Sequence, residues 1–132
     1  MGKFANWLLG SSKRRAEQVA ASHDDAARVL ARAMDKAERQ EGRLRRVWAD
    51  LTALFRLARA WTRGAYRETP WRSIVLVFAA ILYFVNPIDL IPDALLALGY
   101  LDDATVIAWV ARSLKRDLDS FLQWEKSRAP AE

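Results

Sequence analysis

The sequence contains no cysteine, which excludes disulfide bonds, thiolate metal sites and cysteine nucleophiles. Histidine is nearly absent as well, because His23 is the only one among 132 residues. One imidazole cannot form a multi-histidine metal site within one chain. A chain without cysteine is compatible with a reducing compartment. Among the groups that could take part in chemistry, only the carboxylates remain as candidates.

Proline is absent between residues 15 and 66, where glycine occurs only as Gly42 and Gly64. The residues there are mostly strong helix formers, and apolar residues recur in alternating steps of four and three from Val19 to Ala65. This spacing predicts an amphipathic helical region over 15–69, with one packed stripe. Ser22 is the expected N-cap of a helix restart, and Gly42 is the expected bend. The pattern fits both a long rod and a hairpin, and it makes the stripe a candidate surface for self-association or a protein partner.

Positive charge is concentrated in the second half of this region. The chain has 21 lysines and arginines against 16 acids, and residues 43–72 hold eight arginines with only Asp50 and Glu68. An arginine face opposite a leucine and tryptophan face is typical of a helix on an anionic bilayer, and equally of an ordinary helix with a solvated basic face. Nucleic-acid binding is a less favoured third interpretation, because no reader motif is present. The predicted membrane contacts are Arg56, Arg59, Arg63, Arg67, Arg72, Trp61, Trp71 and Trp109.

An uncharged apolar run extends from Ile74 to Val85. As a helix it would be about 18 Å long, which is shorter than the roughly 30 Å of bilayer hydrocarbon. A polar corner follows, for which the predicted turn residues are Asn86, Pro87, Pro92 and Gly99. Basic residues lie on both sides of the segment, so a hairpin would keep both flanks on the cytoplasmic side. The sequence predicts a short helical hairpin that enters one leaflet or packs against the amphipathic helix.

Four aspartates lie in or just after this corner, namely Asp89, Asp93, Asp102 and Asp103. The favoured interpretation is structural, with these carboxylates satisfying backbone N–H groups at helix starts. A second interpretation is a polar site that binds a divalent cation or pairs with an arginine. A third is catalysis by paired carboxylates, which would make the protein a membrane-linked, metal-dependent hydrolase. No other cofactor is expected.

The stretch from Tyr83 to Asp93, YFVNPIDLIPD, followed by LGYLDD from Leu98 to Asp103, resembles the signature of the YkvA-like family. Within the resemblance, which covers about 74–110, Asn86 replaces a frequent serine. The resemblance implies a membrane-associated helical protein, and it implies no activity, because none is established for the family.

We therefore expect an all-α fold made of a long amphipathic lead-in, a short apolar hairpin with a proline–aspartate corner, and a C-terminal amphipathic helix. The expected divisions are a flexible N-terminus or interfacial anchor over 1–14, the basic region over 15–69, the YkvA-like domain over 70–127 and a tail over 128–132. The expected function is non-catalytic: a membrane-associated interaction module on the cytoplasmic side of the plasma membrane, in contact with anionic lipid.

Overall fold

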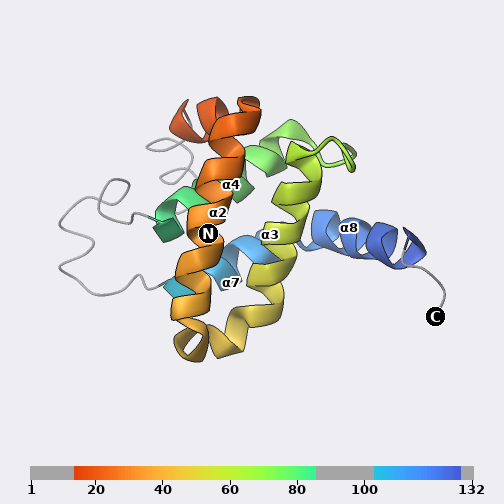
Figure 1. The fold of residues 1–132 in the computed structure, drawn as a ribbon. Helices are drawn as coiled ribbons and strands as arrows, with labels where there is room; N and C mark the ends of the chain where they lie inside the picture. Colours follow the sequence, from red (N-terminus) through yellow and green to blue (C-terminus); the bar gives the residue numbers. More distant parts are fainter. Residues whose placement is uncertain (1–13, 86–102, 129–132) are drawn as a thin grey trace.

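A computed structural model describes residues 14–85 and 103–128. The fold is all-α, as predicted, and the described residues form helices and no strands. A short helix over 14–21 comes first. The remaining elements are α2 (His23–Arg39), the 3₁₀ helix η1 (Glu41–Val47), α3 (Trp48–Thr62), α4 (Trp71–Val85), α7 (Asp103–Ser113) and α8 (Lys115–Arg128) (Figure 1).

Helix α2 begins where the sequence predicts. Ser22 is its N-cap, and the Ser22 hydroxyl accepts a hydrogen bond of 3.2 Å from the backbone N–H of Asp25. Asp24 and Asp25 lie in the first turn of α2 and Lys36 and Arg39 in its last. Each charge therefore has the sign that the helix dipole favours at its end.

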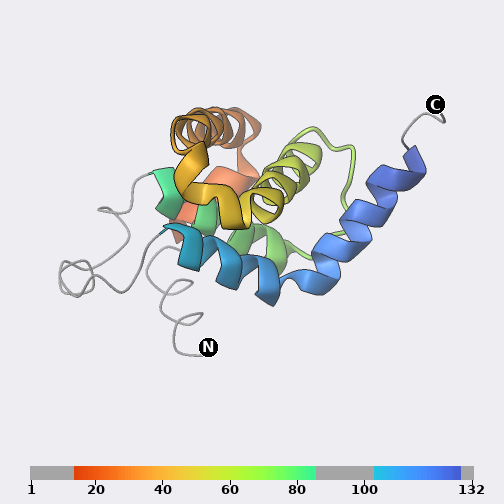
Figure 2. The ribbon, with the colours of Figure 1, turned by 90° about the horizontal axis from the view of Figure 1, so that it is seen from below.

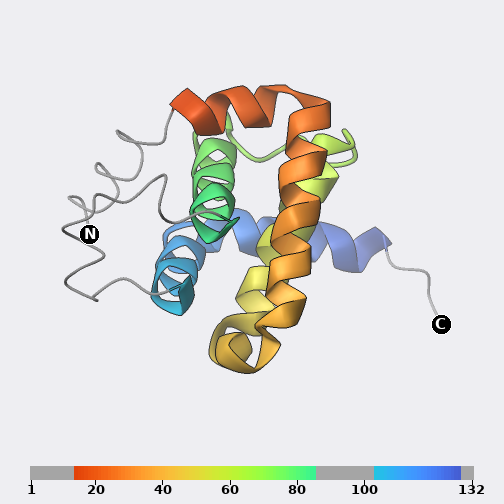
Figure 3. The same ribbon diagram turned by 60° about the vertical axis from the view of Figure 1, so that its left-hand side comes forward.

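The chain reverses direction between α2 and α3, so the two helices form a hairpin and not a rod (Figure 3). The reversal is not a kink at Gly42 alone, because the whole of η1 takes part in it. Gly42 does not have a positive φ. The predicted bend was thus at the right place, but the backbone there is a tight helix that needs no special glycine conformation.

Helix α4 lies in the middle of the fold. Every residue from Ile74 to Phe84 is buried, on all sides of the helix. Its neighbours are α2, α3 and α7, and the helix over 14–21 crosses the ends of α2 and α4 (Figure 3). A helix that is apolar all round belongs in the interior of a protein or a membrane. For α4, three packed helices of the same chain provide that interior.

The predicted C-terminal helix is divided into α7 and α8 at Leu114. The backbone hydrogen bonds continue through the division, from Leu114 N–H to the Val110 carbonyl and from Leu118 N–H to the Leu114 carbonyl. Val110, Leu114, Leu118 and Phe121 are all buried, so α7 and α8 share one apolar face, as expected of an amphipathic C-terminal segment. Figure 2 shows α7 and α8 along the side of the molecule opposite α2.

The apolar stripe from Val19 to Ala65 packs inside the chain. Its members Leu30, Leu44, Leu51, Leu54 and Trp61 belong to one buried cluster with residues of α4 and α7. His23 and Ala65 are exposed. The packing of the stripe is confirmed, because α2, α3 and α4 cover one another there. Self-association or a protein partner through this region stays a prediction.

The same packing corrects the interpretation of residues 43–72 as a helix with its apolar face in lipid. Leu51, Phe55 and Leu57 of α3 are at most 5% exposed, so that face is occupied by protein. Among the helices of the described residues, none combines the length and the apolar character needed to cross a membrane. A hairpin tip at residues 86–102 lies outside the described residues.

Candidate functional site

The loop between α3 and α4 brings several of the predicted membrane-contact residues together. Helix α3 ends at Thr62, with Arg63 as its C-cap, and Gly64 just beyond has a φ of 75°. The N–H of Gly64 donates to the Trp61 carbonyl at 3.0 Å, and the N–H of Ala65 donates to the Ala60 carbonyl at 2.9 Å. These two bonds form a Schellman motif, which satisfies the last carbonyls of the helix and turns the chain sharply. The turn directs residues 65–70 back toward the start of α4.

Tyr66 fixes the middle of this loop. Its ring packs at 5.3 Å from the ring of Phe121 and at 4.9 Å from the ring of Trp124, measured between centroids. Burial raises the pKa of the Tyr66 hydroxyl, and the nearby carboxylates of Glu68 and Asp117 raise it further. The loop is therefore attached to α8 by an aromatic cluster.

Trp71, the first residue of α4, packs against the end of α3. The rings of Trp61 and Trp71 are 6.0 Å apart, and the guanidinium of Arg67 lies 4.4 Å from the centroid of the Trp61 ring. Trp61 is 9% exposed, whereas Trp71 is 43% exposed and is one of the few large apolar side chains at the surface of the described residues. The cation–π contact holds Arg67 beside the exposed indole.

Two more arginines, Arg63 and Arg72, are exposed at the same end of the α3–α4 pair. None of Arg63, Arg67 and Arg72 forms an ion pair within the described part of the chain. We call this surface the arginine–tryptophan corner; it consists of Trp61, Arg63, Arg67, Trp71 and Arg72. It combines cations that form no ion pair within the described residues with an exposed amphipathic ring, where α3, the following loop and the start of α4 meet.

The structure places the other predicted membrane contacts elsewhere. Arg59 is exposed one helical turn before Arg63 and lines a hollow beside α2. Arg56 donates to the carboxylate of Glu125 on α8 at 2.9 Å, so its charge is locally compensated. Trp109 is half-buried on α7, beside Arg46 of η1. The eight predicted residues therefore do not form one surface.

Asp103 begins α7. The other predicted residues of the aspartate site and the turn lie outside the described residues: Asn86, Pro87, Asp89, Pro92, Asp93, Gly99 and Asp102. Within the described ranges, no three carboxylate or imidazole side chains are grouped to bind a metal ion. The divalent-cation site and the hydrolase stay predictions, as does nucleic-acid binding.

Sequence reasoning missed the contact at the C-terminal end of α4. The ammonium of Lys36 on α2 donates a hydrogen bond to the backbone carbonyl of Phe84 and lies 4.8 Å from the centroid of the Phe84 ring. A cation at this place satisfies a terminal carbonyl and suits the helix dipole. No pattern in the sequence indicates this pairing, because the two residues are 48 positions apart.

Two comparisons give matches to known proteins. A family model described as a protein of unknown function, DUF1232, matches residues 73–109, from the first turn of α4 to the middle of α7. The uncharacterized membrane protein YkvA of Bacillus subtilis (strain 168) is 38% identical over 74 residues, which cover 56% of this chain and 70% of YkvA. No solved structure matches. The arginine–tryptophan corner lies just before the segment that the family model matches.

Proposed function

Because this chain belongs to the YkvA-like family of unknown function, whose Bacillus relative is named a membrane protein, we propose that it is a non-catalytic module that binds the surface of an anionic membrane. The contact is made by the arginine–tryptophan corner, and the apolar core stays inside the protein. The observation that carries this proposal is the exposed Trp71 between unpaired arginines.

Both residue types suit a lipid headgroup layer. An indole with one polar atom is favoured at the interface between water and hydrocarbon, and a cation near an anionic leaflet contributes about 1 kcal/mol. Arg63, Arg67 and Arg72 would together contribute about 3 kcal/mol, which corresponds to an affinity gain on the order of 100-fold. The Schellman motif and the Tyr66 contacts hold the backbone of the loop, so little backbone entropy is lost when the loop binds.

This arrangement does not require any helix to enter the bilayer fully. Peripheral binding of this kind predicts release by salt, since screening weakens the attraction between exposed charges. On this proposal, the protein binds the cytoplasmic face of the membrane, where anionic lipids are found.

Vesicle co-sedimentation of the full chain tests the proposal. We expect binding to phosphatidylcholine vesicles that contain phosphatidylglycerol, little binding to phosphatidylcholine alone, and release as salt is raised. The triple variant Arg63→Gln, Arg67→Gln, Arg72→Gln should bind the anionic vesicles on the order of 100-fold more weakly. Trp71→Ser should weaken binding while keeping the salt dependence.

A matched control separates the corner from the net charge. The exposed residues Arg32, Arg43 and Arg45 lie on α2 and η1, and the variant Arg32→Gln, Arg43→Gln, Arg45→Gln removes the same charge. It should retain most of the binding. An equal loss of vesicle binding in the two triple variants would show that only net charge matters. Wild-type protein that does not bind anionic vesicles would refute the proposal.

A further inference from the structure

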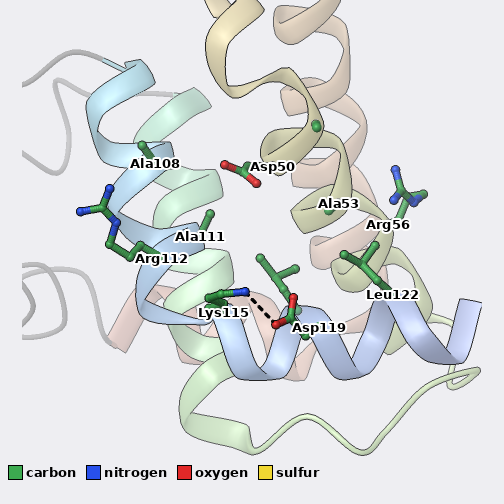
Figure 4. Close-up of a pocket in the computed structure, with 11 residues that line it drawn as sticks. Asp50, Ala53, Arg56, Ala108, Ala111, Arg112, Lys115, Asp119 and Leu122 are labelled. Atoms are coloured by element: carbon green, nitrogen blue, oxygen red, sulfur yellow. Dashed lines mark hydrogen bonds and ion pairs between the residues drawn. The ribbon is translucent and has the colours of Figure 1, made fainter.

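The hollows that border α3 differ in how their charges are compensated. The hollow between α3, α7 and α8 has a volume of about 470 Å³ and contains both signs of charge. Figure 4 shows the ion pair of 3.0 Å between Lys115 and Asp119 in this hollow. Arg56 of α3 also lines it and is paired with Glu125. A second hollow lies where α3 meets α2, and its cations are not compensated in this way.

The second hollow is small and has an apolar side. Its volume is about 290 Å³, close to the lower limit of about 300 Å³ for small-molecule sites. The apolar side is formed by four residues of α2, namely Ala27, Leu30, Ala31 and Met34. Leu30 is buried, whereas Met34 is 37% exposed. An apolar group of a few carbon atoms can therefore pack against α2 at this place.

The opposite side of the hollow is basic. Arg59 and Arg63 both line it and are exposed. They are four residues apart on α3, so their side chains leave the same face of the helix. Neither arginine forms an ion pair within the ranges 14–85 and 103–128. No acidic residue of these ranges lines the hollow, so two guanidinium groups are available to an anion.

Two neutral side chains add further hydrogen-bonding capacity. The hydroxyl oxygen of Thr62, which also lines the hollow, is buried and has no hydrogen-bond partner in the part of the chain that the structure describes. His23 lies across the hollow on α2, and its Nδ1 is 3.7 Å from a carboxylate oxygen of the exposed Asp24. This leaves Nε2 of His23 for another partner. A buried hydroxyl without a partner is unfavourable, and an oxygen of a bound anion would satisfy it.

We propose that this hollow binds a phosphate group that carries a small apolar substituent. A phosphate monoester has three acceptor oxygens and about 1.5 to 2 negative charges. Two guanidinium groups, a hydroxyl and an imidazole match that set of acceptors. A carboxylate has two oxygens and a single charge, so it would leave part of the donor set without a partner. The apolar side chains of α2 cover the substituent.

The inference goes beyond the membrane proposal, because it concerns one small ligand in one hollow. Arg63 belongs both to the hollow and to the arginine–tryptophan corner. Arg59 and Thr62 line the hollow and lie outside the corner as defined above. Variants at these two positions, tested without vesicles, therefore report on the hollow alone.

Isothermal titration calorimetry of the full chain with hexyl phosphate tests the proposal. We expect saturable binding of one hexyl phosphate per chain. Inorganic phosphate lacks the apolar part and hexanoate lacks the phosphate, so each should bind at least about tenfold more weakly. Inorganic phosphate or hexanoate that binds as tightly as hexyl phosphate would contradict the proposed ligand class.

The same chemistry occurs in a free phosphate monoester and in the headgroup of phosphatidic acid. Dihexanoyl phosphatidic acid, titrated below its micelle concentration, distinguishes these sources. Tighter binding than that of hexyl phosphate assigns the hollow to a lipid headgroup. Weaker binding assigns it to a free monoester, and either result supports the phosphate site.

Two variants probe the donors. Arg59→Gln should weaken hexyl phosphate binding about tenfold, because it removes charge-assisted hydrogen bonds. Thr62→Val replaces the hydroxyl with a methyl group, so it should weaken binding several-fold. It should not lower the thermal unfolding midpoint of the ligand-free protein, since the hydroxyl makes no hydrogen bond there to a described residue. A lower midpoint with unchanged binding would show that the hydroxyl serves the fold and would contradict its role in the site.

The matched control is Arg56→Gln, which removes the same charge from an exposed position of α3 where the guanidinium is paired with Glu125. This variant should bind hexyl phosphate as the wild type does. An equal loss in Arg56→Gln and Arg59→Gln would overturn the proposal, because net charge would then explain the binding. A wild type that shows no saturable binding of hexyl phosphate would also overturn it. Loss of vesicle binding alone would refute only the membrane proposal.

Discussion

The middle of α4 and the residues that flank it have opposite relations to solvent. From Ile74 to Phe84 the helix is buried on every side. Trp71 at its start is 43% exposed. Hydropathy alone would assign the membrane contact to the middle of the helix. In the structure the middle of the helix belongs to the protein core, and Trp71 at its amphipathic flank lies at the surface.

The two ends of α4 differ as well. At the N-terminal end, Ser73 donates to the carboxylate of Asp117 on α8 at 2.5 Å, which places a negative charge where the helix dipole is positive. At the other end, the ammonium of Lys36 contacts the Phe84 carbonyl. Neighbouring helices therefore supply both charges that α4 lacks in its own first and last turns. This shows that α4 is adapted to a protein interior.

The largest effect is expected from shortening a side chain in the middle of α4. Phe78 is completely buried, so Phe78→Ala should lower the free energy of unfolding by about 3–5 kcal/mol through lost burial and a cavity. Trp71→Ala, at the exposed flank, should lower it by about 1 kcal/mol or less. Urea denaturation followed by circular dichroism measures both. A similar loss of unfolding free energy in the two variants would contradict the distinction between the buried middle of α4 and its exposed flank.

A smaller effect is expected at the turn that sets the flank. Gly64 has a φ of 75°, and a Cβ added there would meet no atom within 4 Å. Gly64→Ala should therefore cost about 1 kcal/mol of unfolding free energy from backbone strain alone. Gly64→Asn should cost less, because asparagine tolerates the left-handed conformation. Equal stability of wild type and Gly64→Ala would mean that the turn has another backbone geometry.

The smallest effect concerns the pH dependence of the aromatic cluster behind the corner. The folded protein raises the pKa of Tyr66 above its ordinary value of 10.0, mainly by burial. Above that pH the unfolded chain loses a proton that the folded chain keeps, so stability should fall as pH rises further. Phenolate absorbance during an alkaline titration should show a late step that is missing in Tyr66→Phe. A late step that survives in Tyr66→Phe would assign it to another tyrosine.

The sequence predicted the all-α class, the Ser22 cap, the apolar helix up to Val85 and an amphipathic helical segment at the C-terminal side. These features are local, because capping and helical periodicity depend on residues within a few turns. The sequence also identified Arg63, Arg67, Arg72, Trp61 and Trp71 as surface candidates. It could not separate them from Arg56 and Trp109, because that separation depends on which helix lies opposite each residue. Glu125, which pairs with Arg56, is 69 positions away.

Taken by itself, the sequence determined which segments are helical, which faces are apolar and where positive charge accumulates, because these properties follow from residue type and spacing. Only the tertiary structure decided what each apolar face meets. The stripe of α2 and α3 and the full circumference of α4 bury one another, since burial in packed protein removes apolar surface from water as effectively as lipid does. Trp71 and the arginines beside it are among the described residues that stay at the surface.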